Sequence, residues 1–306
     1  MNAKGMKALV TGAAGFIGSH LITRLVREGA EVYAVGRHVP RHREAGIQWS
    51  QGDLAEPEVV RALLGSVRPD VVYHLASHVA GSRDAALVLP TFRSNLTSTV
   101  NILVSATELG SCRVVLTGSL EEPSSTNGDV VPCSPYAAAK WAASAYARMF
   151  HALYELPVVT LRLFMVYGPA QRDLSKLVPY VTLASLRGET PKLSSGLREV
   201  DWIFVDDVVE AFLAAGCASG LGGQVIDVGS GQLVTIRTLV EQLARAVDPA
   251  IAPVFGALPD RPMEQVRRAD AARSQSLLGW SARTPLAEGL AHTVAWYRRA
   301  LESGSL

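Results

Sequence analysis

The chain has 306 residues, of which 48% are hydrophobic and 19% charged, and its formal net charge is +1. This composition supports a sizeable folded core and excludes a disordered chain. The near-zero charge argues against a dedicated binder of nucleic acid or of membrane surfaces, and no apolar run reaches the ~18 residues of a membrane span. The first predicted strand begins too early for a signal peptide, and three widely spaced cysteines indicate free thiols, so we expect a cytoplasmic protein. The seven histidines show no metal-ligand spacing, so no metal site is predicted.

The first predicted strand, Lys7–Val10, leads through a glycine-rich turn into an amphipathic helix. Gly12 permits a tight turn, Gly15 lets a pyrophosphate approach the main-chain N–H groups, and Gly18 lets the helix pack against the strand. The helix N-terminus adds partial positive charge and free donors. This stretch therefore predicts a dinucleotide-binding turn.

A second predicted strand, Glu31–Val35, ends at Gly36 and is followed by Arg37. In folds of this kind an acidic residue at this strand end binds the ribose 2′-hydroxyl of NAD. The missing carboxylate and the guanidinium of Arg37 favour the 2′-phosphate of NADP, with NAD as the alternative. A solvated basic loop is the other interpretation of Arg37.

Apolar strands alternate with helices over the first 165 residues. Strands are predicted at Ile47–Gln51, Asp70–Leu75, Cys112–Thr117 and Val158–Arg162, and helices at Glu56–Leu64, Phe92–Leu109 and Pro135–Tyr154. This alternation predicts an α/β fold with a parallel, doubly wound sheet and right-handed crossovers.

The pattern changes after Pro169 to that of a smaller mixed lobe. Helices are predicted at Leu174–Arg187, Asp206–Ala215, Thr235–Ala246 and Leu286–Leu301, and extended segments at Lys192–Val205 and Val225–Val228. We therefore predict a dinucleotide-binding domain at residues 1–169 and a substrate-binding lobe at residues 170–306, with part of residues 200–230 returning to the main sheet.

Tyr136 and Lys140 lie four residues apart on one predicted helix, so their side chains share a face. A neighbouring ammonium lowers the pKa of a phenol, and Lys140 can also hold the nicotinamide ribose. Tyr136 can then move a proton while the nicotinamide moves a hydride. Ser119, at the end of the preceding strand, can hydrogen-bond the same substrate oxygen.

The glycine spacing and the Ser119, Tyr136 and Lys140 set resemble the extended short-chain dehydrogenase/reductase family. Later stretches extend the resemblance over nearly the whole chain: Leu161–Pro169, Asp201–Asp207 and Asp227–Gly231. The resemblance implies a Rossmann-like fold and a nucleotide-sugar substrate. It also implies a homodimer formed through two long helices, Phe92–Leu109 and the one that carries Tyr136.

The resemblance also assigns the cofactor contacts. It places Asp53 and Leu54 beside the adenine, although Asp53 could instead cap the next helix. It places Leu75, Ala76 and Ser77 across a strand end where the cofactor lies. The full set of predicted cofactor contacts is Gly12, Gly15, Phe16, Ile17, Arg37, Asp53, Leu54, Leu75, Ala76, Ser77, Tyr136 and Lys140.

For the substrate, the resemblance implies a loop that contains His78 and Arg83, with a plain surface loop as the alternative. It implies that Arg198 and Arg261 grip a diphosphate, for which forked guanidinium groups are suited; surface arginines are the alternative. Met165 replaces the asparagine that usually contacts the substrate's diphosphate, so the pose of the nucleotide is left open.

A second departure concerns the chemistry after Ser119. Dehydratases of the family carry Thr-Asp-Glu there, whereas this chain has Ser119-Leu120-Glu121-Glu122, and Leu120 cannot act as the acid. Glu121 remains a candidate base, or both glutamates are simple loop carboxylates. The leading hypothesis is an NADP-dependent reductase of a nucleotide-linked 4-keto-6-deoxyhexose. A nucleotide-sugar 4-epimerase (or a dehydratase-like enzyme) with tightly bound NAD(P) is the alternative, and a non-catalytic dinucleotide sensor is the third.

Overall fold

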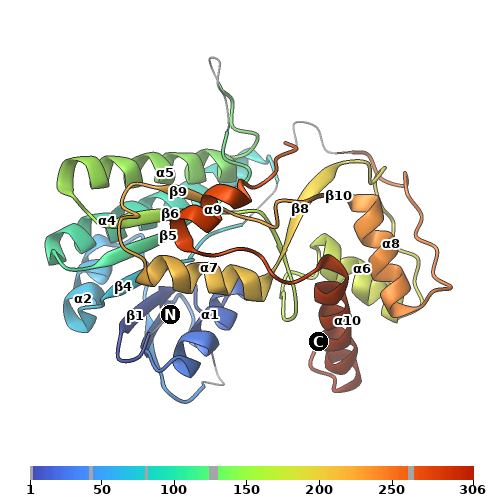
Figure 1. The fold of residues 1–306 in the computed structure, drawn as a ribbon, viewed down its shortest axis with the longest axis horizontal. Coiled ribbons are helices and arrows are strands. Elements are labelled where there is room, and N and C mark those ends of the chain that lie inside the picture. Colours follow the sequence, from blue (N-terminus) through green and yellow to red (C-terminus); the bar gives the residue numbers. More distant parts are fainter. Residues whose placement is uncertain (1–2, 41–43, 80–81, 124–129, 261–264) are drawn as a thin grey trace. The chain divides into compact units, whose positions relative to one another are not determined.

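The computed structural model describes residues 3–40, 44–79, 82–123, 130–260 and 265–306. The chain divides into two compact units (Figure 1). Unit 1 contains residues 1–163, 209–227 and 272–280, and unit 2 contains residues 164–208, 228–271 and 281–306. No described helix is both long and apolar enough to span a bilayer.

Unit 1 is built on a seven-stranded sheet in the order β3-β2-β1-β4-β5-β6-β9. Its strands are β1 (Lys7–Thr11), β2 (Glu31–Gly36), β3 (Ile47–Gln51), β4 (Val71–His74), β5 (Arg113–Ser119), β6 (Val158–Leu163) and β9 (Val225–Val228). Neighbouring strands from β3 to β6 pair in parallel. The sheet confirms the predicted doubly wound α/β fold, and it brings the carboxyl ends of β1, β4 and β5 to one edge.

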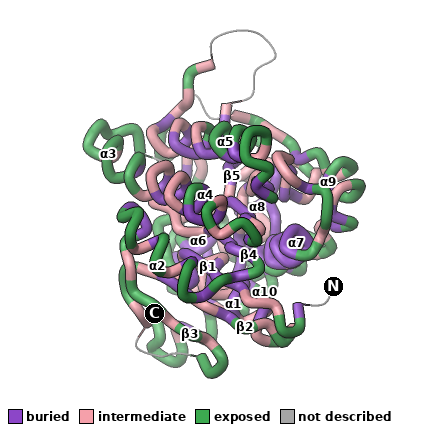
Figure 2. The backbone as a smooth tube through the Cα atoms, turned by 90° about the vertical axis from the view of Figure 1, so that its left-hand side faces the viewer, coloured by how far each residue is buried: buried purple, intermediate pink, exposed green. Residues whose placement is uncertain are grey.

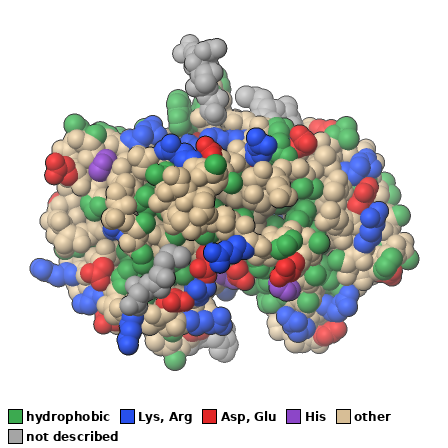
Figure 3. All heavy atoms as spheres, viewed as in Figure 1, with side chains coloured by type: hydrophobic (Ala, Val, Ile, Leu, Met, Phe, Trp, Pro, Cys, Tyr) green, Lys and Arg blue, Asp and Glu red, His purple; other side chains and the backbone are tan. Residues whose placement is uncertain are grey.

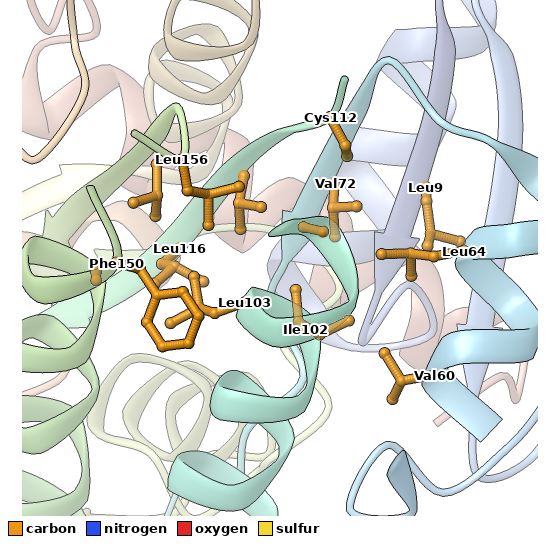
Figure 4. Close-up of a cluster of buried hydrophobic side chains, with 14 of the residues drawn as sticks. Leu9, Val60, Leu64, Val72, Ile102, Leu103, Cys112, Leu116, Phe150 and Leu156 are labelled. Carbon is orange, nitrogen blue, oxygen red and sulfur yellow. The ribbon is translucent and has the colours of Figure 1, made fainter. Parts of the chain in front are cut away.

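Helices cover both faces of this sheet (Figure 1). They are α1 (Phe16–Arg27), α2 (Pro57–Val67), α4 (Ser98–Leu109), α5 (Pro135–Tyr154), α7 (Val205–Cys217) and the short α9 (Ala271–Leu278). A cluster of buried side chains from α2, α4 and α5 packs against one face; Figure 4 shows Leu64, Ile102 and Phe150 turned toward strand residues such as Val72. On the other face, Phe212 of α7 meets the ring of Tyr73 edge-on.

Burial explains why these segments form a parallel sheet. All four residues of β4 are buried, and most residues of β1, β5 and β6 are buried as well. Figure 2 draws the buried parts of the backbone in purple. Strands covered on both faces are apolar throughout rather than alternating. Charged side chains of both signs are interspersed on the surface drawn in Figure 3, in keeping with the net charge of +1.

Unit 2 contains a three-stranded sheet in the order β10-β8-β7. Its elements are β7 (Met165–Tyr167), β8 (Glu199–Phe204), β10 (Leu233–Thr235), α6 (Leu177–Leu186), α8 (Ile236–Val247) and α10 (Leu286–Glu302). The buried carboxylate of Asp201 holds this unit together by accepting hydrogen bonds from the main-chain N–H groups of Ser230, Gly231 and Ala269 at 2.7–3.0 Å.

Several predicted boundaries are wrong. The single helix expected over Phe92–Leu109 is a π-helical segment, η2 (Phe92–Thr97), followed by α4, and a short α3 (Val88–Thr91) precedes it. The extended segment expected over Lys192–Val205 is a strand only at Glu199–Phe204. The three-residue strands β7 and β10 and the helix α9 were not predicted, because such short elements show no clear periodicity.

Candidate active site

The turn between β1 and α1 has the geometry of an anion-binding cradle. Gly12 has φ +66°, and a Cβ there would lie 2.7 Å from the main-chain nitrogen of Ala76. A Cβ on Gly18 would lie 2.2 Å from the carbonyl oxygen of Gly12, so the helix packs directly on the turn. Gly15, the N-cap of α1, has no side chain to cap the helix, and the first turn of α1 holds no acidic residue. The N–H groups at Phe16 and Ile17 therefore remain available for a phosphate.

The end of β4 lies against this turn. The hydroxyl of Thr11 accepts a hydrogen bond from the main-chain N–H of Ala76 at 3.1 Å. Leu75 and Ser77 flank Ala76, and the buried Ser77 hydroxyl has no hydrogen-bond partner within the described parts of the chain. An unpartnered polar atom beside a glycine cradle fits a bound dinucleotide, so the residues present are compatible with this cofactor.

Asp53 and Leu54 lie between β3 and α2. Leu54 is buried, whereas the carboxylate of Asp53 accepts hydrogen bonds from the Ala55 N–H at 3.0 Å and from Arg93 at 3.1 Å. These two bonds lower the pKa of Asp53. The N-cap of α2 is Glu56, so Asp53 is not the cap of that helix. Arg37 directly follows β2 and is exposed.

The predicted catalytic side chains come from β5 and α5. Ser119 is the last residue of β5 and is buried. The hydroxyl of Ser134 caps α5 by accepting a hydrogen bond from the Ala137 N–H at 3.1 Å, which fixes the first turn that carries Tyr136. The Lys140 ammonium lies 5.9 Å from the centre of the Tyr136 ring. The structure thus brings these three residues together.

The electrostatics of Tyr136 differ from the expectation. We expected Lys140 to lower the pKa of Tyr136, but that pKa is raised. Burial of the phenol is the main cause, a hydrogen bond with Ser119 acts in the opposite direction, and the charges of Glu121 and Glu122 raise the pKa further. The described surroundings of Tyr136 therefore favour the neutral phenol.

The Lys140 amine is anchored to the sheet. It donates to the main-chain oxygen and to the hydroxyl of Thr117, both at 2.9 Å, and burial lowers its pKa to about 8. Thr117 in turn donates to the carbonyl oxygen of His74 at 3.2 Å. His74 is fully buried, and its Nδ1 lies 2.8 Å from the Thr11 hydroxyl. Polar contacts thus connect the amine, through three neighbouring strands, to the end of β1.

The two glutamates after Ser119, Glu121 and Glu122, differ in burial and in hydrogen bonding. Glu121 is half-buried, and its Oε2 lies 3.4 Å from the Ser134 hydroxyl. Glu122 is only 1% exposed and accepts hydrogen bonds from the Ser119 N–H at 2.7 Å and from the Ser144 hydroxyl at 2.8 Å. Glu122 is therefore not a solvated loop carboxylate, and sequence reasoning missed its contacts because Ser144 is 22 residues away.

The loop after β4 is tied down at two points. The Asn95 side chain accepts from the His78 N–H at 2.6 Å and donates to the His78 carbonyl oxygen at 3.1 Å. Arg83 donates to the carbonyl oxygen of Cys133 at 3.0 Å, just before α5. Within the described residues, no three His, Cys, Asp or Glu side chains form a group that could hold a metal ion.

The remaining predicted substrate residues belong to unit 2. Met165 begins β7, and Arg198 is half-buried immediately before β8. Arg261 lies outside the described residues.

Comparison with known proteins assigns the family. Residues 8–229 match the family described as "NAD dependent epimerase/dehydratase family". The chain is similar to a UDP-glucose 4-epimerase of Mycolicibacterium smegmatis, with 35% identity over 96% of this chain and 99% of the relative. It is also similar to a dTDP-glucose 4,6-dehydratase of Streptomyces griseus, with 33% identity over 95% of this chain and 94% of the relative.

A solved structure of MoeE5 in complex with UDP-glucuronic acid and NAD is 33% identical, with a TM-score of 0.83, and the match covers 96% of this chain and 99% of that one. The chain therefore belongs to the NAD-dependent epimerase/dehydratase family, that is, to the extended short-chain dehydrogenases/reductases. The predictions of this family and of an NAD(P)-dependent enzyme are confirmed.

Proposed function

We propose that the protein catalyses the 4-epimerisation of a nucleotide-activated hexose. The observation that carries this proposal is the grouping of Ser119, Tyr136 and Lys140 at the sheet edge that also holds the glycine turn. Leu120 stands where the dehydratases of the family have an acid, so the elimination of water lacks its proton donor. The site retains what oxidation and reduction of a secondary alcohol require.

Tyr136, Ser119 and Lys140 each have a separate role in this reaction. A bound nicotinamide supplies a hydride acceptor and donor. Tyr136 takes the proton from the sugar hydroxyl on oxidation and returns a proton on reduction. Ser119 donates a hydrogen bond to the same sugar oxygen and fixes its position. Lys140 holds the nicotinamide ribose, while burial and the nearby glutamates keep the phenol of Tyr136 neutral, the form that returns a proton on reduction.

The relatives support the substrate class. The Mycolicibacterium relative is named a UDP-glucose 4-epimerase, and MoeE5 is described with UDP-glucuronic acid. We therefore assign a uridine diphosphate hexose or hexuronic acid as substrate. His78, Arg83, Met165, Arg198 and Arg261 are the proposed substrate contacts, with the two last arginines on the diphosphate.

A second function, 4-ketoreduction of a nucleotide-linked 4-keto-6-deoxyhexose with NADP, is favoured by two observations. The strand β2 ends at Gly36 and not at a carboxylate, and the exposed Arg37 that follows suits the 2′-phosphate of NADP. The raised pKa of Tyr136 keeps the phenol neutral, which is the form that donates a proton to a ketone. The alternative cofactor for this site is NAD, which is bound in the MoeE5 complex.

One experiment separates these functions. The purified protein is incubated with UDP-glucose, UDP-galactose and UDP-glucuronic acid without added reductant, and the sugars are resolved by chromatography and NMR. Interconversion at C4 that disappears in Tyr136→Phe supports the epimerase. Stoichiometric oxidation of NADPH in the presence of a 4-ketosugar, together with no interconversion at C4, would overturn the epimerase and support the reductase.

We also propose that the protein is a cytoplasmic homodimer. The side chains of Tyr146, Met149 and Leu153 form an exposed apolar stripe on α5. On the neighbouring α4, Val104 is also exposed. An exposed apolar stripe on a long helix suits association with a second copy.

A further inference from the structure

The feature that the proposed mechanism leaves unused is the buried carboxylate of Glu122. It follows β5 by three residues and is 1% exposed. One oxygen, Oε1, accepts the Ser119 N–H at 2.7 Å, and the other, Oε2, accepts the Ser144 hydroxyl at 2.8 Å. Each carboxylate oxygen is therefore bonded to a different element.

These two elements carry the whole catalytic set. Ser119 ends β5, whereas Ser144 lies on α5, four residues after Lys140 and eight after Tyr136. Residues four apart in a helix share one face. The Glu122 carboxylate therefore joins the strand end that presents the serine hydroxyl to the helix face that presents the phenol and the amine.

The surroundings hold this carboxylate in place. A Cβ on Gly118 would lie 2.5 Å from Glu122 Oε1, so a larger residue there would displace the carboxylate. Arg162 of β6 lies 3.8 Å from Oε2, and it also pairs with Asp227 at 2.9 Å. A buried charge requires such a partner, because an unpaired one is costly.

We propose that Glu122 is a positioning residue: its carboxylate fixes Ser119 relative to Tyr136 and Lys140, and its negative charge acts on the phenol and the amine. The inference rests on the proposed function, because it assigns Glu122 to that reaction. Glu122 touches no reacting atom and acts through the three residues that do.

The negative charge of Glu122 acts on the pKa values of Lys140 and Tyr136 in the same direction. Burial lowers the pKa of Lys140, and the Glu122 carboxylate opposes this shift. The same carboxylate raises the pKa of Tyr136, as Glu121 does. Among the described residues, the charged or titratable groups beside this cluster include His74 on β4, which senses the charge of Lys140, and Arg162 on β6, which faces Glu122. The thiol of Cys133 lies 4.0 Å from the Glu121 carboxylate. Removal of the Glu122 charge should therefore lower both pKa values.

Three variants separate position from charge. Glu122→Gln keeps the shape of the side chain and removes its charge, Ser144→Ala breaks the bond to α5 and keeps the charge, and Asp227→Asn is the control. Asp227 lies on β9, and Asp227→Asn removes the other carboxylate that pairs with Arg162. We expect kcat to fall by about 10- to 100-fold in the first two, because small misplacements of catalytic groups have effects of this order, and to be unchanged in the control.

The pH profile of kcat should move to lower pH by about one unit in Glu122→Gln, the order of shift that one nearby charge produces, and should stay in place in Ser144→Ala. Melting curves establish that each variant is folded. The inference is overturned if Glu122→Gln has the same kcat and the same pH profile as Asp227→Asn. The proposed function still stands in that case if the wild type is active and Tyr136→Phe is not.

A second measurement needs no substrate. The chain has five lysines, so selective 13C labelling of their Cε atoms gives five NMR signals, and Lys140→Met assigns the relevant one. We expect this signal to titrate near pH 8 in the wild type and in Asp227→Asn, and at lower pH in Glu122→Gln. If the Lys140 signal titrates at the same pH in Glu122→Gln as in the wild type, the role of the charge is refuted. This result does not depend on activity. Absence of turnover of any nucleotide sugar would separately defeat the proposed function.

Discussion

Burial acts on Tyr136 and Lys140 in opposite directions. It raises the pKa of the phenol and lowers the pKa of the amine, so each side chain is driven toward its neutral form. Of these two side chains, Lys140 is the one whose pKa, about 8, lies closer to neutral pH. At the residue scale, the protonation of this Tyr136–Lys140 pair near pH 8 therefore changes at the amine.

Lys140 should make the stability of the protein depend on pH. Its pKa is about 8 when folded against 10.5 for the unperturbed group, so the unfolded chain binds more protons between these values and stability rises with pH in this window. Relative to Lys140→Met, the wild type should gain about 2 kcal/mol of unfolding free energy between pH 8 and pH 10. Urea unfolding of both proteins at several pH values measures this, and a constant difference would contradict it.

His74 should make the stability of the protein depend on pH at the acid end of the range. Burial, with a smaller effect of the Lys140 charge, lowers its pKa from 6.5 to about 3, so below pH 6.5 only the unfolded chain takes up this proton. Stability should fall as the pH drops through this window, by about 2 kcal/mol at pH 5 relative to pH 7.5. His74→Gln should lack this component. Equal acid sensitivity of the two proteins in urea unfolding would show that His74 is protonated when folded.

The sequence identifies residues whose chemistry is local and misses those whose role is a distant contact. Gly12, Tyr136 and Lys140 are recognisable from spacing alone, because a turn or a helix fixes their geometry. Glu122 and His74 are not, because their partners are 22 and 63 residues away. The direction of the Tyr136 pKa shift was wrong for the same reason, since burial of the phenol is a property of tertiary packing.

At the scale of elements, the main strands and helices of the parallel sheet were predicted, several with their exact ends. Residue ranges for β3, β9 and α5 agree with the structure at both ends. The break at η2 was missed, because it accompanies the side-chain bonds of Asn95 to His78, which no periodicity in the sequence reveals. Segments of π-helix are frequently found at functional sites, and this one holds the loop that is predicted to face the substrate.

The packing of α1 on the glycine turn can be tested with a matched pair of helical glycines. Gly18→Ala would place a Cβ 2.2 Å from the Gly12 carbonyl oxygen, whereas Gly65→Ala in α2 meets nothing within 4 Å. We expect Gly65→Ala to stabilise the protein by about 0.5–1 kcal/mol. Gly18→Ala should lower both the melting temperature and the affinity for the dinucleotide, measured by calorimetry. Unchanged affinity in a folded Gly18→Ala would contradict the proposed cradle.

At the scale of the whole molecule, the proposed homodimer can be tested at the stripe on α5. Leu153 is 65% exposed, more than any other described apolar side chain of the stripe. Met149→Glu combined with Leu153→Glu places two like charges on the face that would be shared, and burial of such unpaired charges opposes association. We expect light scattering to give the mass of a dimer for the wild type and 32.6 kDa for the double variant.

The control for this change is Leu258→Glu, which introduces one such charge at a similarly exposed apolar residue of unit 2. Its mass should remain that of the wild type, because the stripe on α5 is intact. A wild-type mass of 32.6 kDa would defeat the dimer directly. A double variant that keeps the dimer mass would place the contact on another surface, since two added carboxylates per subunit cannot both be accommodated in an apolar interface without loss of affinity.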